Sequence, residues 1–469
     1  MSRIAPLVLA VAMFMEMMDA TVISTSLPAI AADIGTEPIA LKLAMTAYLV
    51  ALAIFIPLSA WIADRFGARN VFRVAIVVFM VGSLACAASD SLGTFVVSRF
   101  LQGIGGSVMV PLARLILVRG TPKHDLVNAM AWLAMPALVG PLMGPPLGGF
   151  LTTYLTWHWI FFINIPIGIG GIIAATLFLP DFPAQKPQPI DWTGFFLTAT
   201  AFSGILFGLS VISLPVLPPI VGISAVFVGA LSLVLYLRHA ARVENPILDP
   251  RIFRHENFRL VSMSTFLFRV AMGTTPFLLP LMLQLGFGYT PFEAGQVMLF
   301  GALGAISAKL FVKPAFKRFG YRSIAFAATA ISTGVFFMSS TFRAETPMVM
   351  MMATMLTAGL ARSTYFTGSN AVQFGDVDED EASQASAIFA VMVQLGLATG
   401  VALAGGLLEL RTFVTGHELV PDDFRTTFRL VGLFSLLSFL PIFWLKHDAG
   451  SEVSGHQARR GENPAVGGS

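Results

Sequence analysis

The chain has 469 residues, of which 56% are hydrophobic and only 12% are charged, about half the ~25% of a soluble domain. A soluble fold of this size could not bury so much apolar surface, because single cores stop growing near ~250–300 residues. This excludes a soluble enzyme, a disordered chain and a secreted disulfide scaffold. The single cysteine allows no internal disulfide, and the net charge of +3 is typical of the basic loops of a membrane protein.

Fourteen apolar runs are long enough to cross a bilayer as helices, which takes about 20 residues each. The sequence therefore predicts an all-α integral membrane protein. Two boundaries are weak, between the fifth and sixth runs and between the seventh and eighth, and merging either pair would give 13 spans. In chain order the runs cover residues 6–27, 43–62, 73–89, 93–117, 128–151, 159–179, 192–212, 216–237, 260–285, 292–312, 323–341, 347–370, 385–408 and 426–445.

The distribution of lysine and arginine orients these runs. With the N-terminus in the cytoplasm, the inside segments hold 20 of the 29 basic residues, the outside segments hold 5, and 4 arginines lie within spans. Cytoplasmic loops carry such an excess of basic residues. We therefore expect both termini in the cytoplasm, although the inside loop 376–381 carries acids as its only charged residues.

A short motif recurs along the chain and predicts a duplication. Residues 65–69 (Arg-Phe-Gly-Ala-Arg) return as residues 318–322 (Arg-Phe-Gly-Tyr-Arg), at an offset of 253 residues. Eight predicted spans separate the two loops, so both face the same side, as a parallel repeat requires. The predicted units are a six-helix bundle, two additional helices, a second six-helix bundle and a disordered cytoplasmic tail, at residues 1–190, 191–240, 241–448 and 449–469.

Three motifs in the first half resemble those of the major facilitator superfamily. The resemblance is closer to its 14-span drug:proton antiporters, and within them to the MdtD-like multidrug resistance proteins of bacteria. Residues 60–69 are similar to the loop pattern G-x-L-a-D-r-x-G-r-k, with Ala60 for the first glycine and Asn70 for the final lysine. Residues 99–106 are similar to R-x-x-q-G-x-g-a, and residues 140–149 to the antiporter signature g-x-x-x-G-P-x-x-G-G. The resemblance implies a major facilitator fold of two pseudo-symmetric six-helix bundles that rock about a central site.

Two of these motifs are interpreted as controlling the movement of the bundles. The loop after the second span is interpreted as a latch, in which Asp64 accepts from a helix N-terminus or from an arginine such as Arg114. The fifth span is interpreted as a bending element between the halves, because small residues allow close backbone contact and prolines remove helical hydrogen bonds. The residues assigned to the latch are Asp64, Arg65, Gly67, Arg69 and Arg114, and those assigned to the bending element are Gly140, Pro141, Gly144, Pro145, Gly148 and Gly149.

Two acidic residues in the first span are the candidate proton carriers. Glu16 and Asp19 are three residues apart and so share one helix face. Two carboxylates near mid-membrane repel each other and lose hydration, so we expect at least one to be protonatable near neutral pH. Arg99 in the fourth span is expected to tune them. The alternative is that one acid pairs structurally with an arginine.

The substrate cavity is assigned to four polar side chains, Gln102, Arg269, Arg362 and Asn370. Counting four arginines within the spans against two acids gives a surplus of positive charge, which favours an anionic substrate. The family resemblance instead implies multidrug transport, usually of lipophilic cations. Both remain open: export of lipophilic compounds, or export of organic anions such as citrate or its metal complex.

The sequence contains no phosphate-binding glycine loop, paired-cysteine metal motif or catalytic constellation. We therefore predict a proton-coupled exporter of the bacterial inner membrane rather than an enzyme, without a cofactor or a metal. Its expected partners are a small-molecule substrate, protons and the lipid bilayer, with no nucleic acid, and it is expected to be a monomer. The competing classes are a membrane enzyme and a transporter-derived receptor that binds its ligand without counterflow.

Overall fold

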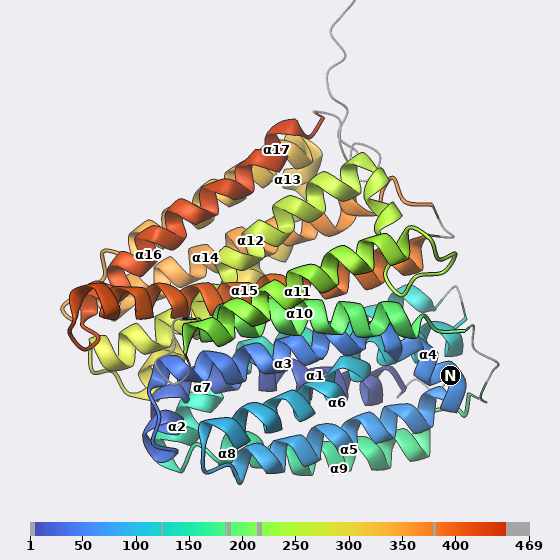
Figure 1. Cartoon of the computed structure of the whole chain (residues 1–469), viewed down its shortest axis with the longest axis horizontal. Coiled ribbons are helices and arrows are strands. Elements are labelled where there is room, and N and C mark those ends of the chain that lie inside the picture. Colours follow the sequence, from blue (N-terminus) through green and yellow to red (C-terminus); the bar gives the residue numbers. More distant parts are fainter. Residues whose placement is uncertain are drawn as a thin grey trace, which may run out of the picture.

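A computed structural model describes residues 5–122, 125–182, 184, 189–212, 218–378 and 381–446. These residues form helices and no strand, so the all-α prediction is confirmed for them. The helices lie roughly side by side along the long axis of the molecule (Figure 1). The tail predicted at 449–469 lies outside the described residues.

The first bundle comprises the elements α1 to α9. Within it, α1 packs against α6, α7 and α9, and α5 packs against α6 and α9. Its elements are α1 (Ala5–Val22), η1 (Ile23–Thr25), α2 (Leu27–Asp33), η2 (Pro38–Leu41), α3 (Lys42–Phe55), η3 (Ile56–Leu58), α4 (Ser59–Phe66), α5 (Ala68–Ala87), α6 (Leu92–Gly120), α7 (Leu126–Tyr154), α8 (Trp159–Phe162) and α9 (Asn164–Phe178).

The second bundle comprises the elements α12 to α17. Within it, α12 packs against α14, α15, α16 and α17, and α13 packs along α14. Its elements are α12 (Glu256–Leu281), the π-helical turn η5 (Met282–Gly286), α13 (Pro291–Ser339), α14 (Met348–Gln373), α15 (Ala382–Thr415), α16 (Pro421–Ser435), η6 (Leu436–Ser438) and α17 (Phe439–Trp444); the short helix η4 (Pro250–Arg254) precedes them.

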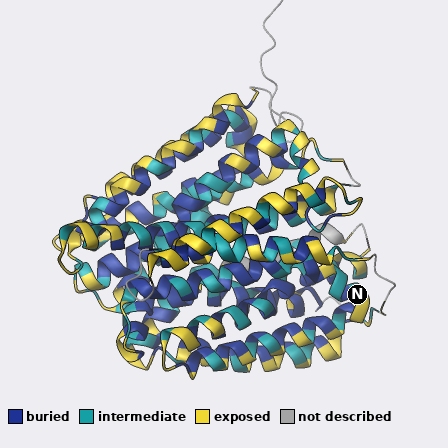
Figure 2. Ribbon diagram, viewed as in Figure 1, coloured by how far each residue is buried: buried dark blue, intermediate teal, exposed yellow. Residues whose placement is uncertain are grey.

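Two further helices, α10 (Trp192–Val211) and α11 (Pro219–Ala240), lie between the bundles in sequence and in space. They pack against each other, and α10 also contacts α3 and α15, one helix from each bundle (Figure 1). Helix α11 leaves large apolar side chains such as Ile220 and Phe227 exposed, and exposed residues cover the outward faces of the other helices as well (Figure 2). An apolar outer surface is what a helix needs in order to face lipid.

Eleven helices among the described residues have the length and apolarity of a membrane span, whereas the sequence predicts fourteen. One of them, α13, covers both the tenth and the eleventh predicted runs. Helices α7 and α14 match the fifth and twelfth runs but are not among the eleven. Both weak boundaries separate distinct helices, since α7 ends before α8 and α10 ends before α11. The count of fourteen stays a prediction.

The repeated motif has the same backbone conformation in both halves. Gly67 and Gly320 have φ of 85° and 72°, in the left-handed region that glycine tolerates best. The arginine two residues later donates to a backbone carbonyl near the C-terminal end of its own bundle: Arg69 to Leu179 at 3.2 Å, and Arg322 to Phe443 at 2.8 Å. The motif therefore connects α5 to the end of α9 in the first bundle, and α13 to α17 in the second bundle.

The acidic loop that departs from the charge pattern has partners near the start of the second bundle. Glu381 accepts from Arg254 at 2.9 Å and lies 2.7 Å from the ring nitrogen of His255. Asn257 donates to Asp376 in the same region. The acids of this loop thus connect the segment between α14 and α15 to residues around the start of α12.

Candidate functional site

A buried polar cluster in the first bundle is centred on Asp19. Its carboxylate accepts from Arg99 Nη1 at 2.7 Å, from Gln102 Nε2 at 2.8 Å and from Asn164 Nδ2 at 2.9 Å. All four side chains are at most 1% exposed. The charges of the acid and the arginine cancel, and two amides hold one carboxylate oxygen. Asp19 thus forms an ion pair with an arginine, as the alternative for one acid of this span expects.

The local sequence of α6 brings the donors to Asp19. Arg99 and Gln102 are three residues apart and share one helix face. A Cβ added at Gly105 would lie 2.5 Å from the backbone nitrogen of Phe79 on α5, so only glycine lets the two helices approach this closely. Asn164, at the start of α9, was not assigned a role from the sequence, because an asparagine in an apolar run does not indicate which distant side chain it meets.

Glu16 lies one turn before Asp19 and has different surroundings. It is 3% exposed, and its Oε2 has no hydrogen-bond partner among the described residues. The Tyr48 hydroxyl lies beside it, and an added Cβ at Gly106 would approach both that hydroxyl, at 3.1 Å, and Glu16 Cγ, at 3.4 Å. Arg114 acts on Glu16 electrostatically but forms no ion pair within the described part of the chain. One acid of the first span is therefore neutralised, and the other is not.

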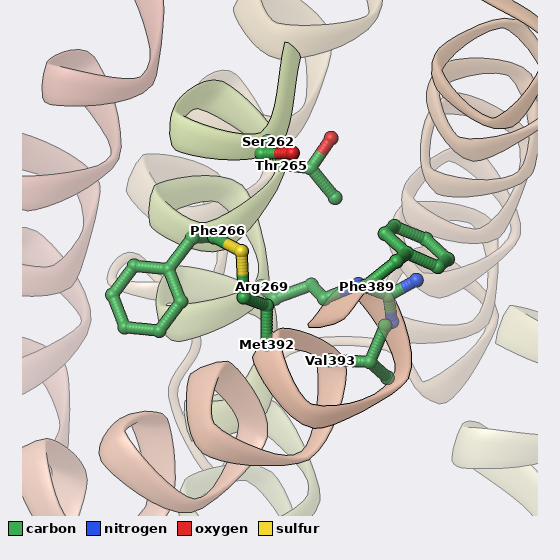
Figure 3. A pocket seen from close by; sticks show the side chains of 7 residues that line it. All are labelled: Ser262, Thr265, Phe266, Arg269, Phe389, Met392 and Val393. Atoms are coloured by element: carbon green, nitrogen blue, oxygen red, sulfur yellow. The ribbon is translucent and has the colours of Figure 1, made fainter. Parts of the chain in front are cut away.

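The two arginines expected to contact substrate lie in the second bundle. Arg269 of α12 places its guanidinium 4.0 Å from the ring centre of Phe366 and 5.8 Å from that of Phe389. Arg362 of α14 is near enough for the two cations to repel each other. Neither forms an ion pair with a described residue. Arg269 borders a narrow pocket (Figure 3), whose lining residues are Ser262, Thr265, Phe266, Arg269, Phe389, Met392 and Val393.

The other three residues assigned to the substrate cavity, Arg362 among them, are not lining residues of this pocket. Gln102 does not line this pocket, because it is fully buried and donates to Asp19. Asn370 is exposed, eight residues beyond Arg362 on α14, and is not among the pocket residues. The sequence placed all four on spans that could line a cavity, but helix rotation decides which side chains face it.

The glycines of α7 allow it to lie directly against α1. Added Cβ atoms at Gly140, Gly144 and Gly148 would come within 2.9, 2.0 and 2.2 Å of α1 or of the short turn that follows it. Their spacing of four residues places them on one face of the helix. Pro141 of the same motif is half-buried. The prediction of close backbone contact is confirmed.

The same motif also contacts the second bundle. An added Cβ at Gly149 would lie 2.3 Å from the carbonyl of Pro291 at the start of α13, and one at Gly295 would lie 2.4 Å from the carbonyl of Pro145. The expected position between the halves is therefore confirmed. The bending attributed to this span stays a prediction.

These glycine contacts between the two bundles lie at the end of the molecule away from the N-terminus (Figure 1). We call this end the closed end. There η1 meets α13, and η2 and the start of α3 meet α15. Besides the glycine contacts, hydrogen bonds join the bundles from Gln284 to the Thr25 carbonyl at 3.0 Å and from Phe292 to Thr153 at 3.1 Å.

An ion pair that the sequence did not suggest also joins the bundles at the closed end. Lys42 Nζ of α3 lies 2.5 Å from Glu409 Oε2 of α15, and the two side chains are 0% and 7% exposed. Gly405, one turn before Glu409, makes room for the lysine stem, since an added Cβ would lie 2.3 Å from Lys42 Cδ. The available signal was Glu409 itself, the only acid in the 34 residues of α15.

The loop interpreted as a latch binds within the first bundle. Asp64 pairs with Arg119 at 2.8 Å, so the suggested pairing of Asp64 with Arg114 is wrong. Arg119 lies one turn further along α6, where the helix reaches the level of the loop. Arg69 pairs with Asp181 at 3.0 Å, and Arg65 is exposed. The role of the loop as a latch between the halves stays a prediction.

Comparison with known proteins covers nearly the whole chain. The family model described as the Major Facilitator Superfamily matches residues 9–243 and 261–467. The chain is 36% identical over 443 residues to a protein named as the transport protein HsrA of Haemophilus influenzae, covering 94% of this chain and 96% of that protein. It is 35% identical over 438 residues to a protein named as the multidrug resistance protein MdtD of Escherichia coli, covering 93% and 92%.

Solved structures share the fold at low sequence identity. The nucleoside transporter NupG superposes with a TM-score of 0.68 at 14% identity, covering 94% of this chain and 100% of that chain. A D-xylose–proton symporter superposes with a TM-score of 0.63 at 13% identity, covering 92% and 96%. From its family match, its relatives and its arrangement of helices, this multi-pass membrane protein belongs to the Major Facilitator Superfamily and is a transporter rather than an enzyme.

Proposed function

We propose that the protein is a proton-coupled exporter of small molecules, an antiporter that works by alternating access in the bacterial inner membrane. The observation that carries the coupling is the contrast between the two acids of α1. Asp19 is held by Arg99, whereas Glu16 Oε2 is buried without a hydrogen-bond partner among the described residues. A buried carboxylate without a partner is costly when charged and far less costly when protonated.

In this mechanism Glu16 carries the proton, and the Asp19–Arg99 pair supplies a fixed, neutral neighbour. When the bundles open to the outside, Glu16 takes up a proton. When they open to the cytoplasm, it releases the proton as substrate binds. The membrane potential contributes about 2.3 kcal/mol per charge for each 100 mV.

The arrangement of the bundles supports a rocking motion. The first and second bundles meet at the closed end through α7 and α13 and through α3 and α15. With both termini in the cytoplasm, the closed end is the outer one. Rocking about the central site would separate these contacts and bring together the ends near Ala5.

For the substrate, the relative named as a multidrug resistance protein supports lipophilic compounds, which apolar and methionine-rich surfaces accommodate. A second candidate keeps the transport cycle and changes the cargo to organic anions. It is favoured by Arg269 and Arg362, which have no acidic partner among the described residues.

Proton release from everted membrane vesicles tests the coupling. We expect lipophilic substrates such as ethidium, or citrate-like acids in the second case, to cause proton release with the native protein and none with Glu16→Gln. Glu345→Gln is the matched control, because Glu345 is exposed in the turn between α13 and α14 and should leave release unchanged. Unaltered proton release by Glu16→Gln would exclude Glu16 as the carrier.

A further inference from the structure

We propose that Arg269 and Arg362 form an anion-binding subsite in the second bundle, and that this subsite takes the acidic group of an amphiphilic organic acid whose aromatic body lies against Phe266 and Phe389. The inference rests on the proposed transport function and names the chemical class of its substrate.

The first observation is uncompensated charge. Cations inside a membrane protein are usually paired with an acid or with carbonyls. Within the described residues, Arg269 and Arg362 have no ion pair and donate no hydrogen bond, and Arg269 Nε is buried without a partner. The buried acids Asp19 and Glu409 are occupied by Arg99 and by Lys42. The counter-charge that these two arginines lack is one that a bound anion would bring.

The second observation is the support given to the Arg269 guanidinium. The group lies over the face of Phe366 and near Phe389, which attracts a cation and holds its plane in position. An aromatic ring satisfies none of the five N–H donors, because the ring interacts through its face. The guanidinium is therefore positioned while its donors stay available, and a planar carboxylate can accept two of them at once.

The third observation is the chemistry of the adjoining pocket. Figure 3 shows Arg269 extending from α12 toward Phe389 and Val393 of α15, with Thr265 one turn away on α12. The Thr265 hydroxyl is buried beside that of Tyr365. A hydroxyl and a guanidinium without an ion pair thus border one pocket whose other walls are mostly apolar.

The size of the pocket limits what enters it. In this conformation the space within it is too small for a water molecule, so the subsite opens only when its lining side chains move apart. The acidic group would then reach Arg269, and the remainder of a larger substrate would extend between the bundles. A lipophilic cation would meet two arginines of its own sign here, so the subsite discriminates by repulsion as well as by attraction.

Three probes with one aromatic body and different charges test the inference. They are 1-naphthylacetate, the neutral 1-naphthylacetamide and the trimethyl(1-naphthylmethyl)ammonium cation. Binding is measured by calorimetry on the full chain in nanodiscs, without a proton gradient. We expect the acetate to bind at least tenfold more tightly than the amide and the cation to bind most weakly. Arg269→Gln with Arg362→Gln should abolish the preference for the acetate, and Arg269→Lys should keep part of it.

The controls separate this inference from the proposed function. Arg343→Gln, at an exposed arginine after α13, should leave the preference unchanged, and thermal unfolding shows whether each variant is folded. Glu16→Gln should keep the preference while it loses proton release. Preferred binding of the acetate without proton release by the native protein would overturn the exporter and leave the subsite. Proton-coupled transport of the cation, or equal binding of all three probes, would overturn the subsite and leave the exporter.

Discussion

The ion pair between Lys42 and Glu409 should set how firmly the closed end stays closed. Replacing Glu409 by Gln, or Lys42 by Met, leaves one charged or polar group buried between the bundles without its charged partner. Removing one member of a buried pair costs about 3–5 kcal/mol. The pair spans 367 residues and joins α3 to α15, so this cost falls on the closed arrangement of the bundles rather than on either bundle alone. The ratio of closed to open molecules should therefore fall by roughly two to four orders of magnitude.

Distances between spin labels report this equilibrium directly. Labels at Glu37→Cys and Glu418→Cys lie on exposed positions of opposite bundles at the closed end, and Cys86→Ser removes the single native cysteine. We expect the single variants to add or enlarge a population with a longer distance between the labels. Lys42→Met combined with Glu409→Leu should restore most of the short distance, because replacing both members of a buried pair by apolar residues is often close to neutral.

A matched control is the exposed pair between Lys446 and Glu256, whose side chains are 67% and 45% exposed. Lys446→Met removes the same kind of charge and should not change the label distances, since exposed pairs contribute at most about 1 kcal/mol. If Glu409→Gln is folded and gives the same distance distribution as the native chain, the pair does not hold the closed end together, and the reasoning is refuted.

Three further predictions concern the first bundle and are measured by thermal unfolding in detergent. Arg99→Gln should lower the free energy of unfolding by about 3–5 kcal/mol. Adding Asp19→Asn to the same chain should recover most of that loss, because the neutral pair leaves no buried charge. A double variant whose loss is the sum of the two single losses would contradict the ion pair. Gly148→Ala should lower the free energy of unfolding by about 1–3 kcal/mol, because its new Cβ would lie 2.2 Å from the Val22 carbonyl. Gly170→Ala is the control: its new Cβ meets nothing within 4 Å, so the change should be neutral or stabilising. Equal effects of the two variants would rule out the packing argument. Asp64→Asn should cost at most about 1 kcal/mol, since its pair with Arg119 is partly exposed, and a larger loss would show that the loop has a structural role beyond that pair.

The location of the motifs could be read from the sequence, and their partners only in part. The loop at 65–69 and its repeat at 318–322 were recognised as equivalent, and both contain a glycine with positive φ. The glycines of α7 were expected to allow close backbone contact, and Gly148 packs against α1 while Gly149 packs against α13 of the second bundle. The suggested partner of Asp64 was wrong, because arginines five residues apart on α6 both lie near the end of that helix, and only the folded chain shows which one reaches the loop.

The membrane class and the helical architecture could be determined from the sequence alone, because hydropathy and charge bias add up residue by residue and need no knowledge of which helices are neighbours. The family was inferred from the resemblance of its motifs. The tertiary structure decided that Asp19 is neutralised while Glu16 is not, that Gln102 belongs to the Asp19 cluster, and that Lys42 meets Glu409. Each of these depends on the rotation of a helix about its own axis and on contacts between residues 80 to 367 positions apart. An apolar run fixes neither, since a helix that is hydrophobic on all sides shows no preferred face.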